Sequence, residues 1–393
     1  MSLSIPLSIS EDILRDEGAH IAKAVAATGL NPDDRTRISA RAAGLVRDIR
    51  SADAPGLMEV FLAEYGLSTS EGVALMCLAE ALLRVPDAAT IDDLIEDKIA
   101  PSDWGQHLGR SSSSLVNAST WALMLTGRVL DERGASAAAT LRGAVKRLGE
   151  PVIRTAVARA MREMGRQFVL GESIDSAMTR AAKMEARGYS YSYDMLGEAA
   201  RTMDDAKRYH SAYARAIRAI GARATGNDIR TNPGISVKLS ALHPRYEVAQ
   251  EDRVMAELVP RARELARLAA ALGLGFNIDA EESDRLALSL KVIDRVLDDP
   301  ALDGWDGFGV VVQAYGPRAA DTIDWLAAKA ESLDRKIMVR LVKGAYWDTE
   351  IKRAQVMGLD GFPVLTHKPA SDVNFIACAR QLLAARTRLY PQL

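Results

Sequence analysis

The chain has 393 residues, of which 48% are hydrophobic and 26% are charged. This length allows one large domain with an extension, and the hydrophobic share is enough to bury a sizeable core. The formal net charge is −2, which gives no reason to expect binding to nucleic acid or to an anionic membrane surface. Basic stretches such as RTAVARAMREMGR have the Ala, Met and Val spacing of an amphipathic helix with a solvated basic face.

Cysteine and histidine usage argues against a disulfide framework and against a zinc site. The two cysteines, Cys77 and Cys378, are far apart in apolar helical contexts, and the five histidines form no His-x-x-x-His pair. The N-terminus lacks the basic start and long apolar run of a signal peptide. No apolar stretch approaches the roughly 20 residues of a membrane span. We therefore expect a cytoplasmic protein without a resident metal, and leave peripheral contact with the inner membrane open.

Residues 1–185 show helical periodicity and almost no strand signal. Apolar residues recur at helical spacing in LMEVFLAEYG, EGVALMCLAEALLRV, IDDLIEDKIA and DSAMTRAAKMEA. Pro86, Pro101 and Pro151 fall between helical runs, where proline commonly marks a helix boundary. We predict a helical arm and linker domain over these residues.

From residue 186 to residue 393, short apolar strands alternate with helical stretches. Five β-then-α units follow one another, with strands predicted at 191–196, 234–242, 274–280, 308–315 and 336–344. This order predicts an α/β fold with a parallel sheet covered by helices. A (β/α)8 barrel and an open doubly wound sheet both fit the alternation. No Gly-x-Gly-x-x-Gly follows the first strand, which argues against a Rossmann dinucleotide site.

Polar residues recur at the C-terminal ends of these predicted strands. They are Asp194, Lys238, Asp279 with Glu281 and Glu282, Gln313, and Arg340 with Lys343. Because the active site of a βα barrel forms at that end of its strands, this placement predicts a catalytic face.

Lys238 interrupts an apolar strand, ISVKLSAL, where a buried ammonium needs a partner or a ligand. It could pair with Asp279, anchor a substrate carboxylate, or do both. The three carboxylates of NIDAEESDR could do acid–base work or bind a divalent metal. Glu281 and Glu282 are better explained as charges that complement a helix N-terminus, which leaves Asp279 as the better functional candidate.

The segment RLVKGAYWDTEIKRAQ begins as a strand and turns into a charged helix. Arg340 could donate to a ligand ring nitrogen or an anion, or form a structural ion pair. Gly344 and Ala345 allow close approach to the backbone. Tyr346 and Trp347 could be core residues, although two adjacent aromatics after a small-residue step are less usual there.

Thr366, His367 and Lys368 come just before a helix predicted at 371–386. Backbone N–H groups at a helix start, with Thr and Lys nearby, can hold a phosphate. An N-cap at Ser371 explains most of this pattern without a ligand.

Six motifs occur in order along residues 185–393: YSYDMLGEAART, SVKLSALHPRYE, NIDAEESDR, VVVQAYGPR, RLVKGAYWDTEIKRAQ and GFPVLTHKPASDVNF. Together they resemble the proline dehydrogenase domain of bacterial Proline utilization A, in the family's order and at close spacing. The helical region before them is similar to the arm and linker that precede the barrel in that family.

The resemblance implies FAD on a distorted (β/α)8 (TIM) barrel. The implied reaction oxidises L-proline to Δ1-pyrroline-5-carboxylate by hydride transfer to flavin N5, passes the electrons to a membrane quinone, and serves proline catabolism to glutamate. The implied catalytic residues are Lys238 at the proline carboxylate, Arg340 beside N5, and Asp279 and Tyr346 around the substrate. The implied cofactor-binding residues are Gln313, Arg340, Val342, Gly344, Ala345, Trp347, Thr366, His367 and Lys368.

Departures from the family pattern lead to two further expectations. The family's domain continues past the motif beginning LYPQ, so we expect a barrel truncated after about five βα units. Such a chain would lack the arginine pair that clamps the substrate and the aldehyde dehydrogenase (pyrroline-5-carboxylate dehydrogenase) module. Some relatives begin with a ribbon-helix-helix domain, whereas this chain starts with the helical arm, so we predict no DNA binding.

Three hypotheses follow. The first is an FAD-dependent proline dehydrogenase, whole or partial. The second is a metal-dependent barrel lyase that uses Asp279, Glu281 and Glu282, and it predicts loss of activity to chelators and no yellow colour. The third is a catalytically incompetent fragment or assembly piece of the same bifunctional enzyme. The motif set favours the first, and tight flavin binding would separate it from the other two.

Overall fold

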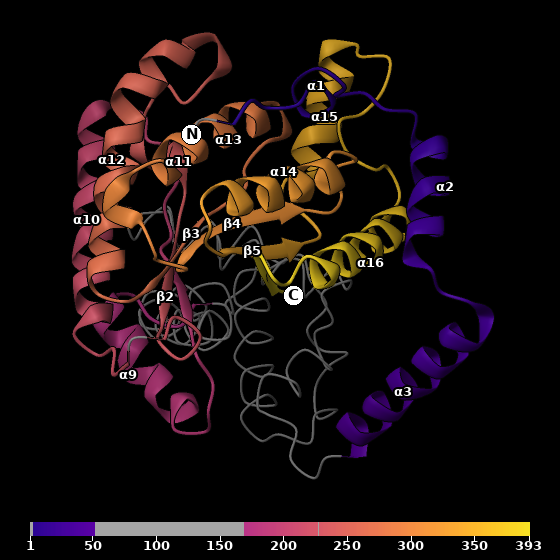
Figure 1. Ribbon diagram of the computed structural model, residues 1–393, viewed down its shortest axis with the longest axis horizontal. Helices are drawn as coiled ribbons and strands as arrows, with labels where there is room; N and C mark the ends of the chain where they lie inside the picture. Colours follow the sequence, from indigo (N-terminus) through magenta and orange to yellow (C-terminus); the bar gives the residue numbers. More distant parts are fainter. Residues whose placement is uncertain (1–2, 52–168, 227) are drawn as a thin grey trace, which may run out of the picture. The chain divides into compact units, whose positions relative to one another are not determined.

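The computed structural model describes residues 3–51, 169–226 and 228–393 (Figure 1). The helical segments predicted between residues 52 and 168, and Cys77 with them, lie outside the described residues. Two compact units divide the chain, one made of Met1–Arg35 with Met178–Leu393 and the other of Thr36–Ala177. Helices α3 (Pro32–Ser51) and α9 (Ile174–Glu185) cross the limits between these units. Helix α9 confirms the helix predicted in DSAMTRAAKMEA.

The first unit contains one parallel sheet of six strands, in the order β1 to β6. The strands are β1 (Ser192–Asp194), β2 (Gly234–Val237), β3 (Gly275–Ile278), β4 (Phe308–Gln313), β5 (Ile337–Val342) and β6 (Leu389–Gln392). Strands that are adjacent in sequence are adjacent in the sheet, as in a βα barrel, whereas a doubly wound sheet reverses its order. The predicted α/β barrel class is confirmed as a TIM-like partial barrel, and the five predicted strands are joined by a sixth at LYPQ.

Helices cover the outer side of the strands and pack on one another (Figure 1). The connecting helices are α10 (Met203–Gly221), α11 (Leu239–Leu242), α12 (Glu251–Ala271), α13 (Leu286–Leu297), α14 (Ala319–Ser332), α15 (Trp347–Met357) and α16 (Lys368–Ala384). Helix α10 packs on β2, α12 on β3, and α14 on β4 and β5. Tyr213, Ile217 and Ile220 recur at helical spacing and form the buried face of α10.

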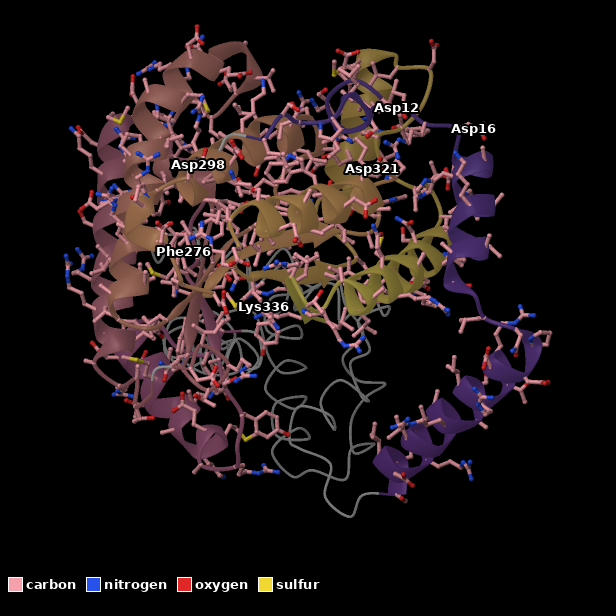
Figure 2. The ribbon with its side chains drawn as sticks, viewed as in Figure 1. Asp12, Asp16, Phe276, Asp298, Asp321 and Lys336 are labelled. Carbon is pink, nitrogen blue, oxygen red and sulfur yellow. The ribbon has the colours of Figure 1, made fainter. Side chains whose placement is uncertain are left out.

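The core lies between the strands and this outer helical layer. Phe276 of β3 and Phe308 of β4 are both fully buried, and their ring centroids lie 5.9 Å apart (Phe276 is labelled in Figure 2). Every residue of β2 and β3 is buried, as expected for parallel strands covered on both faces. Gly309 lies opposite Asn277, and a Cβ at this position would come within 2.0 Å of the Asn277 Oδ1 atom. Only glycine fits there.

The N-terminal segment packs on the βα part of the same unit. Helix α1 (Leu7–Ser10) contacts α13 and α14, and α2 (Glu17–Thr28) lies along α16. Ile9 is fully buried. This compact unit combines residues from both ends of the chain. The predicted domain division at residue 185 stays a prediction.

Two predicted boundaries are wrong. The strand predicted at 234–242 ends at Val237, and the short helix α11 follows it, so Lys238 lies after the strand rather than within it. Apolar residues continue on both sides of Lys238, and so short an apolar segment does not distinguish a strand from a helix. Helix α16 begins at Lys368 with His367 as N-cap, and Ser371 is buried one turn further on. Pro369 in the first turn explains this earlier start, because proline fits the first turn of a helix.

No helix within residues 3–51, 169–226 and 228–393 is both long enough and apolar enough to cross a membrane.

Arg318 joins the N-terminal segment to the barrel. Its side chain donates from Nη1 to the Ile9 carbonyl at 2.8 Å and from Nη2 to the Ser283 carbonyl at 2.6 Å. The residue is only 3% exposed, and burial lowers its pKa to about 10. We expect Arg318→Met to lower the free energy of unfolding by about 3 kcal/mol, because both carbonyls lose a charged donor. Urea denaturation measures this.

Arg386→Met provides the control, since Arg386 is exposed and its side chain bonds to the Leu383 carbonyl in the last turn of the preceding helix α16. We expect this variant to stay within about 0.5 kcal/mol of the parent chain. Equal effects of the two substitutions would contradict the structural role of Arg318.

Candidate active site

One face of the sheet carries most of the polar side chains found near the carboxyl ends of its strands. Residues two apart along a strand share a face. Face-sharing residues near the carboxyl ends are Ser192 and Asp194, Ser236 and Lys238, Asn277 and Asp279, Val311 and Gln313, and Arg340 and Val342. The parallel register brings these five pairs together.

Lys238 and Asp279 form the centre of this face. The Lys238 ammonium lies 2.8 Å from Asp279 Oδ2 and 3.4 Å from Asp194 Oδ1. The Lys238 and Asp279 side chains are only 16% and 13% exposed. Burial opposes protonation of Lys238, but the hydrogen bond and charge of Asp279 outweigh it and raise the pKa of the ammonium. Burial also raises the pKa of Asp279, and the bond from Lys238 opposes that rise.

Arg340 reaches from β5 toward the same cluster. Its Nη1 donates to Ser236 Oγ at 2.9 Å and its Nη2 donates to Ser192 Oγ at 2.8 Å. Nη1 also lies 3.8 Å from Asp279 Oδ1. The structure therefore brings together three of the predicted catalytic residues, and two serines from neighbouring strands fix the guanidinium.

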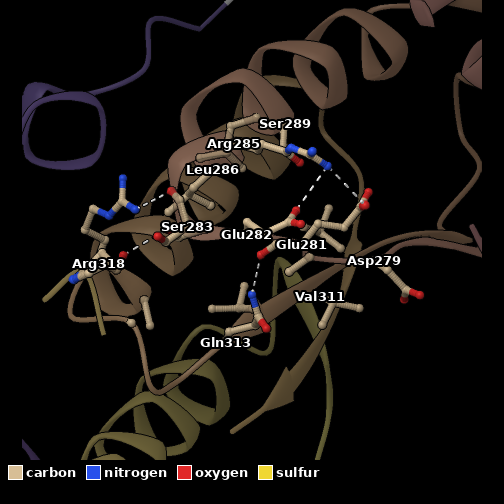
Figure 3. A pocket seen from close by; sticks show the side chains of 18 of the residues that line it. Asp279, Glu281, Glu282, Ser283, Arg285, Leu286, Ser289, Val311, Gln313 and Arg318 are labelled. Carbon is tan, nitrogen blue, oxygen red and sulfur yellow. Dashed lines mark hydrogen bonds and ion pairs between the residues drawn. The ribbon is translucent and has the colours of Figure 1, made fainter. Parts of the chain in front are cut away.

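Gln313 links the loops that follow β3 and β5. Its Nε2 donates to the Glu281 carbonyl at 2.9 Å (Figure 3), and its Oε1 accepts from the Ala345 N–H at 3.1 Å. Gly344 precedes this contact with a φ of +135°, and a Cβ here would lie 2.4 Å from the Tyr315 ring. The backbone therefore passes close to Tyr315 only because residue 344 is glycine.

Glu281 and Glu282 are engaged by neighbouring groups (Figure 3). Glu281 is buried and accepts from the Ser240 N–H at 3.0 Å, and Arg285 lies 3.1 Å from Glu282 and 3.7 Å from Glu281. Burial raises the pKa of Glu281, which the bond from Ser240 opposes. Glu281 therefore accepts from a backbone N–H in the first turn of α11. The described residues bring together no cluster of three potential metal ligands.

The adjacent aromatics Tyr346 and Trp347 lie at the rim rather than in the core. Tyr346 donates to Glu198 at 3.4 Å, and burial, with the Glu198 charge, raises the pKa of the phenol. Trp347 donates from Nε1 to the Leu365 carbonyl at 2.9 Å and remains 40% exposed. An aromatic surface is thus left open beside Ala345, which is also exposed.

The predicted phosphate-binding residues Thr366, His367 and Lys368 lie at the start of α16. Lys368 and Lys343 both pair with Asp372, and the Lys368 side chain is 75% exposed. His367 is exposed and its side chain makes no cap bond. Thr366 is directed elsewhere: it donates to Glu17 of the N-terminal segment.

Sequence reasoning missed Ser192, Ser236 and Glu17. The two serines carried a usable signal, because each lies two residues before a strand-end charge, Asp194 or Lys238, and so shares its face. Glu17 carried none, since 349 positions separate it from Thr366.

These features define a βα-barrel protein with a charged site at the carboxyl ends of its strands. A family model described as Proline dehydrogenase matches residues 177–393, which is more than half of the chain. The chain belongs to the proline dehydrogenase family.

Known relatives agree with this assignment. The Bifunctional protein PutA of Escherichia coli (strain K12) is 53% identical over 338 residues, which cover 86% of this chain and 26% of that protein. A crystal structure of a bifunctional proline utilization A protein has a TM-score of 0.72 at 48% identity and covers 100% of this chain and 39% of that one. Proline dehydrogenase 1 of Bacillus subtilis (strain 168) is 27% identical over 46% of this chain and 52% of that protein. The chain spans about a quarter of the length of the Escherichia coli relative.

A second family model, described as the DNA-binding domain of Proline dehydrogenase, matches residues 57–168. These residues lie outside those that the structure describes. The match gives no support to the expectation that the chain binds no DNA, and we do not retain that expectation.

We expect Lys238→Met to lower the free energy of unfolding by about 2 kcal/mol, because it leaves the largely buried Asp279 charge without its nearest partner and with only the more distant Arg340. With Lys238 absent, burial raises the pKa of Asp279 against the weaker opposition of Arg340 alone, so the folded chain gains a proton more readily than the unfolded chain. The loss should therefore be larger near about pH 8 than near about pH 4. Urea unfolding at both pH values measures it.

A second substitution tests the cause. Adding Asp279→Asn to Lys238→Met should recover part of the lost stability, since the buried carboxylate charge that lost its nearest partner is then gone. Lys207→Met is the control, because its pair with Asp204 is exposed and contributes little. A double variant less stable than Lys238→Met alone would argue against an unpaired charge at Asp279.

Proposed function

We propose that the chain carries FAD-dependent oxidation of L-proline to Δ1-pyrroline-5-carboxylate by hydride transfer to flavin N5. The observation that carries the proposal is the cluster of Lys238, Asp279 and Arg340 beside the open rim at Ala345 and Trp347. The family assignment supports oxidation of proline in particular.

The cluster has the charges that a free amino acid needs. Proline is a zwitterion, so its site must offer a cation to the carboxylate and an anion or acceptor to the nitrogen. Lys238 keeps its proton, since its pKa is raised, and so serves the carboxylate. Asp279 lies 2.8 Å from that ammonium, close enough for one small molecule to reach both groups.

The rim residues fit a cofactor with a flat ring and a phosphate tail. Val342, Ala345 and Trp347 offer apolar surface, and the Gln313 amide offers polar atoms at a ring edge. Lys368 and His367 are exposed at a helix start, where an anion is favoured. FAD, when bound, would accept the hydride, and Arg340 would stabilise the negative charge that develops beside it.

Further parts of the proposal rest on the bifunctional relatives. We extend it to a quinone as electron acceptor and to an aldehyde dehydrogenase module that consumes the product. The same relatives support a role in proline catabolism to glutamate, in the cytoplasm and with peripheral contact at the inner membrane.

The test is a visible absorption spectrum of the purified chain, before and after L-proline is added without oxygen. We expect a flavin spectrum that bleaches, because hydride transfer reduces the flavin. A flavin spectrum that proline leaves unchanged would favour the catalytically incompetent fragment. A chain that stays colourless with added FAD would overturn the cofactor assignment.

Two variants sharpen this test. Lys238→Met should keep the flavin spectrum and bleach at least about 100-fold more slowly, since Lys238 is assigned to the substrate and the loss of a charge-assisted contact of about 3 kcal/mol has this effect. Lys207→Met, on the exposed face of α10, should bleach like the parent chain. Bleaching of Lys238→Met at the parent rate would remove Lys238 from the substrate site.

A further inference from the structure

The N-terminal segment contacts the loops that surround the proposed site. Arg15 donates to the Pro317 carbonyl at 2.9 Å and pairs with Asp12 and Asp321, both labelled in Figure 2. His20 contacts the buried Asn374, which donates to the carbonyl of Ala314 directly after β4. These contacts position α2 beside the loop that leads into α16.

At this position Glu17 meets Thr366. The Thr366 N–H lies 3.1 and 3.2 Å from the two carboxylate oxygens of Glu17, and Thr366 Oγ1 lies 2.8 Å from Oε2. A second contact joins Thr366 Oγ1 to Nδ1 of His367 at 2.9 Å. Glu17, Thr366 and His367 therefore form a continuous chain of hydrogen bonds that ends at an exposed imidazole.

The number of available protons determines which group donates in each of these hydrogen bonds. An ionised carboxylate only accepts, so the single hydroxyl proton of Thr366 goes to Glu17. The Thr366 oxygen must then accept from His367, which places a proton on Nδ1. Nε2 is left as the ring nitrogen that a ligand can reach, and in the neutral ring it accepts a hydrogen bond. In a neutral imidazole the site of the proton is set by what the other nitrogen contacts.

We propose that Glu17 is a positioning residue for the cofactor's ribityl-phosphate part, acting through Thr366 to hold His367 in its Nδ1–H form, so that Nε2 accepts a hydrogen bond from a ribityl hydroxyl. This inference rests on the proposed function. It differs from the prediction that Thr366 itself holds the phosphate, because the Thr366 N–H and O–H are both directed to Glu17. Lys368 remains as the cation that meets the phosphate, and His367 as the acceptor that meets a hydroxyl.

A competing explanation predicts the opposite change in FAD affinity when Glu17 is removed. If Glu17 only occupied an anion site, its negative charge would repel the cofactor phosphate, and its removal would tighten FAD binding. If Glu17 positions His367, its removal frees the ring and weakens FAD binding.

The first measurement is the tautomer of His367 by 15N NMR of histidine-labelled chain without FAD, near about pH 8.5, where an ordinary imidazole is neutral. His367→Gln assigns the signal among the five histidines. We expect an Nδ1–H signal in the parent chain and in Thr366→Ser, and loss of the Nδ1–H preference in Thr366→Val and Glu17→Ala. An Nε2–H signal in the parent chain would overturn the proposal, whether or not the chain binds FAD.

The second measurement is FAD affinity by fluorescence titration. We expect Glu17→Ala and Thr366→Val to weaken binding about tenfold, and Thr366→Ser to stay within about twofold of the parent. Glu11→Ala is the matched control, since Glu11 is an exposed carboxylate on the same segment. Tighter binding by Glu17→Ala would establish the competing explanation. Absence of FAD binding by the parent chain would count against the proposed function, and the tautomer would still decide the role of Glu17.

Discussion

The pairing of Lys238 with Asp279 is the interaction on which the site depends. Two mostly buried side chains of opposite charge lie 2.8 Å apart, and the attraction between them offsets the free-energy cost of removing each charge from water. The parallel register places them there, because residues 237 and 278 end neighbouring strands in matched positions. Asp279 also approaches Arg340, so one carboxylate links cations from β2 and β5.

The loops around this cluster are fixed from outside the barrel. Arg318 donates to carbonyls of the N-terminal segment and of the loop after β3, and Arg15 donates to the loop after β4. Glu17 accepts from Thr366 before α16. Each contact joins a charged side chain to backbone atoms, which are strong and directional partners. The segment that precedes the barrel in sequence therefore contributes to the geometry of the loops around the proposed site.

The sequence predicted the fold class and the five strands because short apolar segments alternate along the chain with stretches of helical periodicity, and both patterns are local. It predicted Lys238, Asp279 and Arg340 as one site, since charges that follow apolar strands meet at one edge of a parallel sheet. It misplaced the end of β2, because apolar residues continue on both sides of Lys238 and no local pattern marks where the strand ends and α11 begins. Contacts such as those of Arg318 with Ile9 could not be predicted, since 309 positions separate the two residues and no local pattern marks the pair.

In the proposed function, the charges of the site hold an amino acid rather than move protons. Lys238 keeps its proton, because Asp279 and Asp194 raise its pKa, and so it is a poor base. Tyr346 keeps its proton as well, since burial raises the pKa of its phenol. Asp279 accepts from Lys238 and faces Arg340, so protonating it would break the contacts that position both cations. The proposed oxidation therefore depends on orientation and charge complementarity, with the hydride acceptor supplying the chemistry and Arg340 stabilising its reduced state.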